Sequence, residues 1–145
     1  MSKTISIDPG ISKCGLIVAD VNSKKVCSAE VIKSEYLVNH LKMICQYKQQ
    51  HQLIIGNGTS SSNYINKLSE FIPNLIIAEE KNSTYRAKQR YFEIFPLIGL
   101  KSFLPREIFI LNKNLDAIAA LIIMEDYFQV KFNFSKKIKT KTWLK

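Results

Sequence analysis

Carboxylates stand at the ends of apolar segments at three separate places in the chain. Asp8 ends one apolar segment and precedes a Pro-Gly turn, the pair Glu79 and Glu80 follows another, and Asp116 begins a third. Each has a structural explanation, as a turn residue, a strand end that reaches water, or an acid that complements a helix dipole. Acids at the edge of the core, rather than on polar faces, are also what a shared catalytic site requires.

Electrostatics restricts what such acids could do if the fold brought them together. Two carboxylates about 4 Å apart repel by on the order of 4 kcal/mol at an effective dielectric constant of about 20. That is a large part of a typical net stability of about 5–15 kcal/mol. Converging acids must therefore share protons, stay apart or hold cations. All-oxygen ligands favour Mg²⁺ or Mn²⁺, and paired ions of this kind activate water for phosphodiester cleavage.

The elements that must position these acids follow from the hydrophobic pattern. Apolar residues at strand spacing, joined by short turns, predict an antiparallel meander over residues 4–8, 15–20 and 25–32. Further along, the pattern predicts strands at 53–55 and 75–78. It predicts one helix that begins after Ser34, which could cap it, and further helices over 60–71, 83–95 and 115–128. Residues 96–112, with two prolines and a glycine, are expected to form an irregular connection.

This order of elements predicts an α/β fold. Three antiparallel strands followed by strand–helix crossovers give a mixed five-stranded sheet with helices on its faces. Ligands on such sheets usually bind at the carboxyl ends of the strands, near the point where the connection order reverses. The topology can therefore bring Asp8, the Glu79–Glu80 pair and Asp116 to one end of the sheet.

The charge of the chain favours a polyanionic partner. Its 145 residues, enough for one domain, carry 21 Lys and Arg against 12 Asp and Glu, a net charge of +9. Such an excess favours nucleic acid or an anionic membrane surface. Residues 129–145 contain six lysines and no acid, so we predict a domain over 1–128 and a basic C-terminal tail over 129–145. The alternative is that these lysines only keep the end of the chain solvated and bind no partner.

No segment indicates a membrane protein or a disulfide-stabilised one. The longest apolar run, residues 117–124, is far below the roughly 20 residues that span a bilayer, and the start has no apolar stretch of signal-peptide length. The cysteines, at positions 14, 27 and 45, form no close pair of the kind that a disulfide framework or a zinc site uses. We predict a cytoplasmic protein that does not bind membranes.

Three motifs resemble those of a known nuclease family. The segment Ile5-Ser6-Ile7-Asp8-Pro9-Gly10, followed by Gly15, resembles the first motif of the RuvC-like nucleases of the RNase H superfamily, and over roughly residues 3–128 the chain resembles the YqgF (RuvX) family more closely. That family has a glycine-containing fourth strand, an Asp-Glu-Arg-x-Thr motif, and a helix that starts with Asp followed by Ala and aliphatic residues. Here these places read Ile54-Ile55-Gly56, Glu79-Glu80-Lys81-Asn82-Ser83-Thr84 and Leu115-Asp116-Ala117-Ile118-Ala119-Ala120.

The resemblance implies metal-binding carboxylates at Asp8, Glu80 and Asp116 that hold Mg²⁺ or Mn²⁺. Glu79 stands where the family has Asp and is a fourth catalytic candidate; Glu80 is preferred over it because Glu80 matches the family's residue type. Four basic residues near these positions are candidate nucleic-acid contacts: Lys13, Lys81, Arg86 and Arg90. The two arginines lie four residues apart on one helix face, which could equally be a solvated charged face.

The family's known activity sets the expected function. Its members are magnesium-dependent nucleases linked to maturation of the 5′ end of 16S ribosomal RNA, so we predict an endonuclease of precursor rRNA with a role in ribosome biogenesis, acting as a monomer or homodimer. One alternative is a Holliday junction resolvase that cuts branched DNA, for which symmetric cleavage needs a homodimer. Another is a non-catalytic nucleic-acid-binding or ribosome-assembly protein, which the departures at Glu79 and Lys81 keep open.

Overall fold

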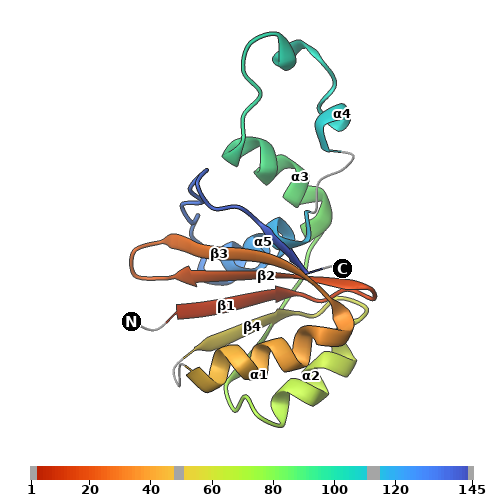
Figure 1. Cartoon of the computed structure of the whole chain (residues 1–145), viewed down its shortest axis with the longest axis vertical. Helices are drawn as coiled ribbons and strands as arrows, with labels where there is room; N and C mark the ends of the chain where they lie inside the picture. Colours follow the sequence, from red (N-terminus) through yellow and green to blue (C-terminus); the bar gives the residue numbers. More distant parts are fainter. Residues whose placement is uncertain (1–2, 48–50, 111–114, 144–145) are drawn as a thin grey trace.

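A computed structural model describes residues 3–47, 51–110 and 115–143, whose strands form one mixed sheet (Figure 1). The strand order is β5-β4-β1-β2-β3-β6. β1 and β3 each pair antiparallel with β2, whereas the β1–β4, β4–β5 and β3–β6 pairs are parallel. The strands are β1 (Lys3–Asp8), β2 (Lys13–Asp20), β3 (Lys25–Lys33), β4 (Gln52–Gly56), β5 (Leu75–Ala78) and β6 (Lys141–Trp143).

Helices cover both faces of this sheet. Figure 1 shows α1 and α2 on one face and α3 and α5 on the other. The helices are α1 (Leu37–Tyr47), α2 (Ser61–Ser69), α3 (Ser83–Ile94), α4 (Arg106–Ile110) and α5 (Asp116–Phe128), with 3₁₀ turns η1 (Ser34–Tyr36) and η2 (Gly99–Phe103). In the described part of the chain, no helix is long and apolar enough to cross a lipid bilayer.

The predicted fold is confirmed. Three antiparallel strands are followed by two strands that return in parallel on the other side of β1, which is the arrangement of an RNase H-like α/β fold. The five predicted strands and the helices that connect them all form. β6 was not predicted, because a strand of three residues has too little periodicity to stand out.

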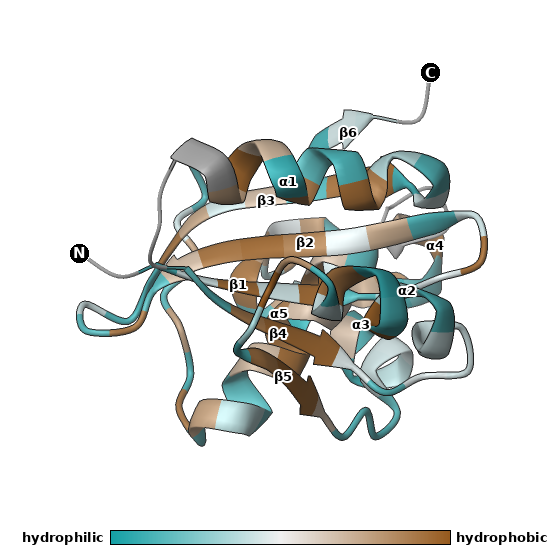
Figure 2. Ribbon diagram, turned by 90° about the horizontal axis from the view of Figure 1, so that it is seen from below, coloured by the Kyte–Doolittle hydropathy of each residue, from teal (hydrophilic) through white to brown (hydrophobic). Residues whose placement is uncertain are grey.

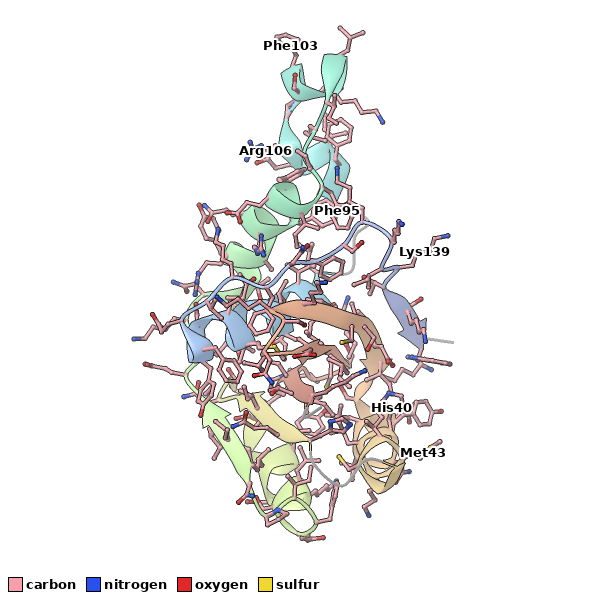
Figure 3. All side chains as sticks on the ribbon, turned by 90° about the vertical axis from the view of Figure 1, so that its left-hand side faces the viewer. His40, Met43, Phe95, Phe103, Arg106 and Lys139 are labelled. Atoms are coloured by element: carbon pink, nitrogen blue, oxygen red, sulfur yellow. The ribbon has the colours of Figure 1, made fainter. Side chains whose placement is uncertain are left out.

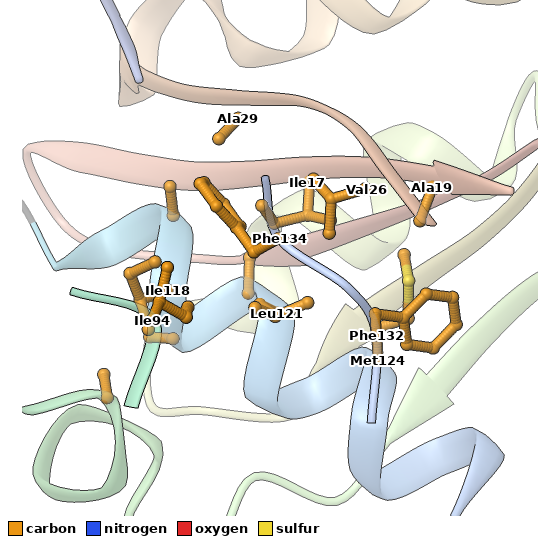
Figure 4. Close-up of a cluster of buried hydrophobic side chains, with 14 of the residues drawn as sticks. Ile17, Ala19, Val26, Ala29, Ile94, Ile118, Leu121, Met124, Phe132 and Phe134 are labelled. Atoms are coloured by element: carbon orange, nitrogen blue, oxygen red, sulfur yellow. The ribbon is translucent and has the colours of Figure 1, made fainter. Parts of the chain in front are cut away.

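The sheet separates two hydrophobic layers. Figure 2 shows that its central strands are themselves largely hydrophobic. Because side chains alternate along a strand, Ile5 and Ile7 of β1 pack toward α1 and α2. Ile17 and Ala19 of β2 pack toward α5 on the other face, as Figure 4 shows. All residues of α5 from 117 to 125 are buried, as its nearly continuous apolar sequence predicts.

The segment set apart as a basic tail packs onto the domain through its described residues. Phe132 and Phe134 are buried in the layer between α5 and the sheet (Figure 4). Asn133 exchanges backbone hydrogen bonds with the β2–β3 hairpin, and β6 pairs with β3. The boundary predicted at residue 128 therefore does not separate a folded domain from a tail. Alternate apolar residues insert, while the described lysines of this segment, at positions 131, 136, 137, 139 and 141, stay exposed.

Residues 96–110 extend away from the sheet as an arm (Figure 1). The predicted irregular connection contains the short elements η2 and α4 instead of wholly irregular chain. Five large apolar side chains of the arm are 50% to 86% exposed: Ile98, Leu100, Phe103, Leu104 and Ile108. Figure 3 places Phe103 at the far end of the arm, and Arg106 lies nearer the body with its guanidinium 5.3 Å from the centre of the Phe92 ring.

Candidate active site

Asp8 reaches the candidate site because β1 ends there on the face that α5 covers. Ile5 and Ile7 point to the opposite face, so strand alternation directs Asp8 toward α5. Its neighbours in the sheet are small: Asp8 pairs with Gly15 of β2, and Gly56 ends the adjacent strand β4. The absence of side chains at both glycines leaves room for carboxylates between the strand ends and α5.

Glu80 occupies a space that two glycines provide. A β-carbon added to Gly56 would lie 2.9 Å from Glu80 Oε2, and one added to Gly58 only 2.6 Å from it. Between them, Asn57 accepts a hydrogen bond from the Glu80 amide through its Oδ1 at 2.9 Å, and Ser83 Oγ donates to Glu80 Oε1 at 2.7 Å. Glu80 Oε2 is buried and has no hydrogen-bond partner among the described residues.

Asp116 comes close to the strands because α5 packs directly on backbone. A β-carbon added to Gly15 would lie 1.9 Å from the carbonyl oxygen of Asp116, so only glycine allows this approach. The Asp116 Oδ2 atom lies 3.1 Å from Nζ of Lys13, at the start of β2. The first turn of α5 therefore lies over β2 beside the position of Asp8.

The electrostatics shows that three of the acids meet. The pKa of Asp8 is raised from 3.8 to about 8, first by burial and then by the negative charges of Glu80 and Asp116. Residues from three distant parts of the sequence therefore influence one another electrostatically. The carboxylate of Asp8 is costly to ionise until some positive charge balances the cluster.

Glu79 lies outside this cluster. Its Oε2 atom is 3.1 Å from Nζ of Lys81, and both side chains are largely exposed, at 67% and 71%. Glu79 and Glu80 follow the end of β5 and have different partners: Glu79 pairs with Lys81, whereas Glu80 hydrogen-bonds to Asn57 and Ser83. The structure therefore brings Glu80, and not Glu79, toward Asp8 and Asp116, a choice that the sequence motif alone left open.

The donor set suits a hard divalent cation, although the described side chains do not form a complete metal site as they stand. Among residues 3–47, 51–110 and 115–143, no group of three or more His, Cys, Asp or Glu side chains could hold a metal ion as it stands. The raised pKa of Asp8, to which a side-chain hydrogen bond with Glu80 contributes, indicates that these two acids share a proton where no cation balances them. All the donors are carboxylate oxygens, which suit Mg²⁺ or Mn²⁺.

The four predicted basic contacts lie in different surroundings. Lys13 is paired with Asp116 inside the site, and Lys81 lies exposed at its rim. Arg86 forms a two-pronged ion pair with Asp126, with Nη2 2.8 Å from Oδ1. Lys81, Arg86 and Asp126 help line a cavity of about 360 Å³ beside the end of β5.

Arg90 is directed inward and is only 11% exposed. Its guanidinium donates to both oxygens of Glu125, at 3.1 and 2.8 Å, and to the carbonyl oxygen of Phe132 at 2.9 Å. The i, i+4 spacing correctly places Arg86 and Arg90 on one face, but that face meets α5 instead of solvent. Arg90 holds α3, α5 and the chain after α5 together, so we do not include it among the proposed nucleic-acid contacts.

Sequence reasoning missed the residues that fix Glu80. Ser83 was quoted only as a member of the motif that contains Glu80, without a role, and Asn57 was not considered, yet both hydrogen-bond to Glu80. Their one sequence signal is position: Ser83 follows the acid by three residues, and Asn57 stands between two glycines after a buried strand.

Comparison with known proteins finds a structural likeness only. No protein-family model matches the chain, and no curated protein sequence matches it. A solved structure of T. thermophilus RuvC in complex with Holliday junction substrate aligns with a TM-score of 0.49 and 14% identity, covering 89% of this chain and 96% of that one. The resemblance to the YqgF family therefore rests on the sequence motifs.

Proposed function

We propose that this protein is a metal-dependent nuclease that hydrolyses phosphodiester bonds in nucleic acid. One observation carries the proposal: Asp8 is buried beside Glu80 and Asp116, and its burial, followed by the charges of those two acids, raises the pKa of Asp8 to about 8. A protein that only binds polyanions gains nothing from buried, clustered negative charge. A hydrolase gains a site for cations that activate water and stabilise the leaving oxygen.

The chain's own residues divide the work around this cluster. Asp8, Glu80 and Asp116 would hold Mg²⁺ or Mn²⁺, which supplies the activated water and the positive charge for the developing oxyanion. Ser83 and Asn57 orient Glu80 through the hydrogen bonds described above. Lys13 balances Asp116, and Lys81 presents an exposed ammonium group that can contact a phosphate at the rim of the site.

Precursor 16S rRNA is the substrate that we propose. The motifs at Asp8, at Glu79–Lys81 and at Asp116 resemble those of the YqgF family, whose members act in maturation of that RNA. The net charge of +9 suits a polyanion, and the exposed lysines after α5 extend basic surface beyond the site. Branched DNA is the other substrate to be tested, since the same chemistry would cleave it.

The ion pair between Lys13 and Asp116 supports a second candidate, a non-catalytic nucleic-acid-binding or ribosome-assembly protein. A lysine 3.1 Å from the carboxylate can balance the charge that a metal ion would otherwise balance. In such a protein the acids of the cluster would have a structural role, with the charge of Lys13 in place of a metal ion. This candidate predicts no cleavage under any metal condition and no stabilisation by divalent cations.

The deciding experiment compares cleavage of labelled precursor 16S rRNA and a four-way DNA junction during titration with Mg²⁺ or Mn²⁺. We expect the wild-type protein to cleave the RNA, and Asp8→Asn and Glu80→Gln to lose at least about a hundredfold in rate, the scale of effect for a metal ligand or its support. Glu79→Gln makes the same chemical change one residue away and should stay within a few-fold of wild type.

Each other outcome has a definite meaning. Cleavage of the junction alone would transfer the proposal to branched DNA. Equal activity in wild type and Asp8→Asn would place the activity elsewhere, and absence of cleavage with every metal would favour the non-catalytic protein. Loss of activity in Glu79→Gln but not in Glu80→Gln would show that the wrong glutamate was assigned.

A further inference from the structure

The turn between β1 and β2 carries two groups of the candidate site. Asp8 stands at its start and Lys13 at its end, with Lys13 Nζ 3.1 Å from Asp116. The turn is tight: a β-carbon on Gly10 would lie 2.1 Å from the carbonyl oxygen of Lys13. Any shift of the Gly10 peptide would therefore move Asp8 and Lys13 together.

Two hydroxyl groups from distant parts of the chain bind this peptide. Ser34 Oγ donates to the Gly10 carbonyl oxygen at 2.9 Å, and Tyr64 Oη donates to the same oxygen at 3.0 Å. The backbone amide of Ser34 also donates to the carbonyl oxygen of Ser12 at 3.0 Å. The sequence suggested Ser34 as a helix cap, but Ser34 is the first residue of η1, and its hydroxyl donates to the turn instead.

A buried thiol completes the contact. Cys14 Sγ lies 3.5 Å from the Gly10 amide nitrogen and 3.6 Å from Ser34 Oγ. Both the amide and the carbonyl of Gly10 are thus engaged from within the fold. Burial raises the pKa of Tyr64 above its usual value, so its hydroxyl remains a donor at neutral pH.

These groups lie on the other face of the sheet from the carboxylates. Tyr64 belongs to α2, and it packs with Cys14 in the hydrophobic layer beneath α1 and α2. Asp8 points toward α5 on the opposite face. Ser34 and Tyr64 can therefore influence the site only through the backbone of the turn.

We propose that Ser34 and Tyr64 form a clamp on the Gly10 carbonyl that holds the β1–β2 turn, and that both are positioning residues for the hydrolysis at Asp8. This inference rests on the proposed nuclease function and names residues that none of the sequence motifs includes. The clamp makes α2 and the start of η1 part of the support of the site. It explains why two hydroxyls from segments 30 residues apart converge on one peptide.

The test uses Tyr64→Phe, Ser34→Ala and the double variant, with Ser34→Thr as the conservative variant that keeps the hydroxyl. Ser69→Ala is the matched control, because Ser69 Oγ also donates to a backbone carbonyl from α2 but faces solvent away from the turn. We expect kcat to fall about tenfold in each single variant and about a hundredfold in the double, the scale of loss for an ångström of misplacement. KM should change less than twofold, and Ser34→Thr should retain most of kcat.

A second measurement separates the clamp from the proposed function. Amide hydrogen exchange of residues 11–13 is recorded on metal-free protein without substrate, and we expect at least tenfold faster exchange in Tyr64→Phe and Ser34→Ala but not in Ser69→Ala. Unchanged exchange in both clamp variants would overturn the clamp even if the protein cleaves RNA. Faster exchange with unchanged kcat would show that the clamp is structural only. Absence of cleavage by wild type would overturn the nuclease and with it the positioning role, while exchange would still report the clamp.

Discussion

Replacing Asp8 by Asn should remove a pH dependence of stability that the acidic cluster creates. Asp8 has a pKa of about 8 in the folded protein, against an ordinary value of 3.8. Between these values the folded state keeps a proton that the unfolded chain has released, so stability falls as pH rises. The contribution is fully present below about pH 4 and is lost as pH rises through about 8. Asn resembles the protonated carboxyl in shape and does not titrate.

The size of the effect follows from linkage. While Asp8 is protonated only in the folded state, each pH unit lowers the free energy of unfolding by about 1.4 kcal/mol, so wild type should lose about 3 kcal/mol relative to Asp8→Asn between pH 5 and pH 7. At pH 8 and without metal, the variant should be the more stable protein. Near pH 4 the two should differ little.

Urea unfolding at pH 5, 6, 7 and 8 in the presence of a chelator measures this difference. Titrating groups outside the acidic cluster, such as Glu30, are present in both proteins, so the difference between wild type and variant reports Asp8 and the acids that interact with it. Added Mg²⁺ should restore wild-type stability at pH 8 and leave the variant unchanged, because a ligand of the folded state adds to its stability. A difference that stays constant with pH, or a variant less stable than wild type at pH 8, would refute the electrostatic reasoning.

Three further substitutions test the packing around the site. Arg90→Met leaves Glu125 buried without its cation and should lower the free energy of unfolding by about 3–5 kcal/mol, measured by urea unfolding, whereas Glu125→Gln in the same background should recover part of that loss. Phe132→Ala should cost about 3–5 kcal/mol by the same measurement, and a cost near zero would show that the chain after α5 does not pack on the domain. Phe103→Ser at the exposed end of the arm should change stability by no more than about 0.5 kcal/mol, which thermal unfolding would check.

The fold could be predicted because each element has a local signal of its own. The alternation of Ile5 and Ile7, the short buried strand before Gly56, and the nearly all-apolar sequence of α5 each indicate one type of structure. Their order then leaves few topologies. The arm was described less well, since its prolines interrupt any periodicity and its apolar residues remain exposed instead of revealing a buried face.

The surroundings of the basic residues could not be predicted, because they depend on tertiary partners. Arg90 looks like a surface residue in a charged helix, and only the position of Glu125 and of the Phe132 carbonyl explains its burial. The lysines after α5 suggested a free tail, and the alternation of Phe132 and Phe134, which is typical of a short strand, was not enough to predict that this segment packs on the domain. Charge indicates where a side chain must end, but not where the backbone that carries it lies.

The choice between Glu79 and Glu80 shows a different limit of prediction from sequence. Two consecutive residues of one type differ only in direction, and direction is set by the strand end and by the loop that contacts it. Here Gly56 and Gly58 leave a space that Glu80 fills, and Asn57 binds the Glu80 amide. The glycines were visible in the sequence, but their relation to a residue 24 and 22 positions further along the chain was not.

Glycines and acids are matched at this site in a way that argues for an ion. Gly15 lets α5 bring Asp116 against β2, and Gly56 and Gly58 let Glu80 lie beneath the strand ends. A side chain at Gly56 or Gly58 would collide with the Glu80 carboxylate, and a side chain at Gly15 would collide with the backbone of Asp116. Glycine at these three positions therefore lets the acids lie near one another, while Lys13 pairs with Asp116. A cluster assembled against its own repulsion is best explained by a divalent cation that the folded chain is shaped to bind.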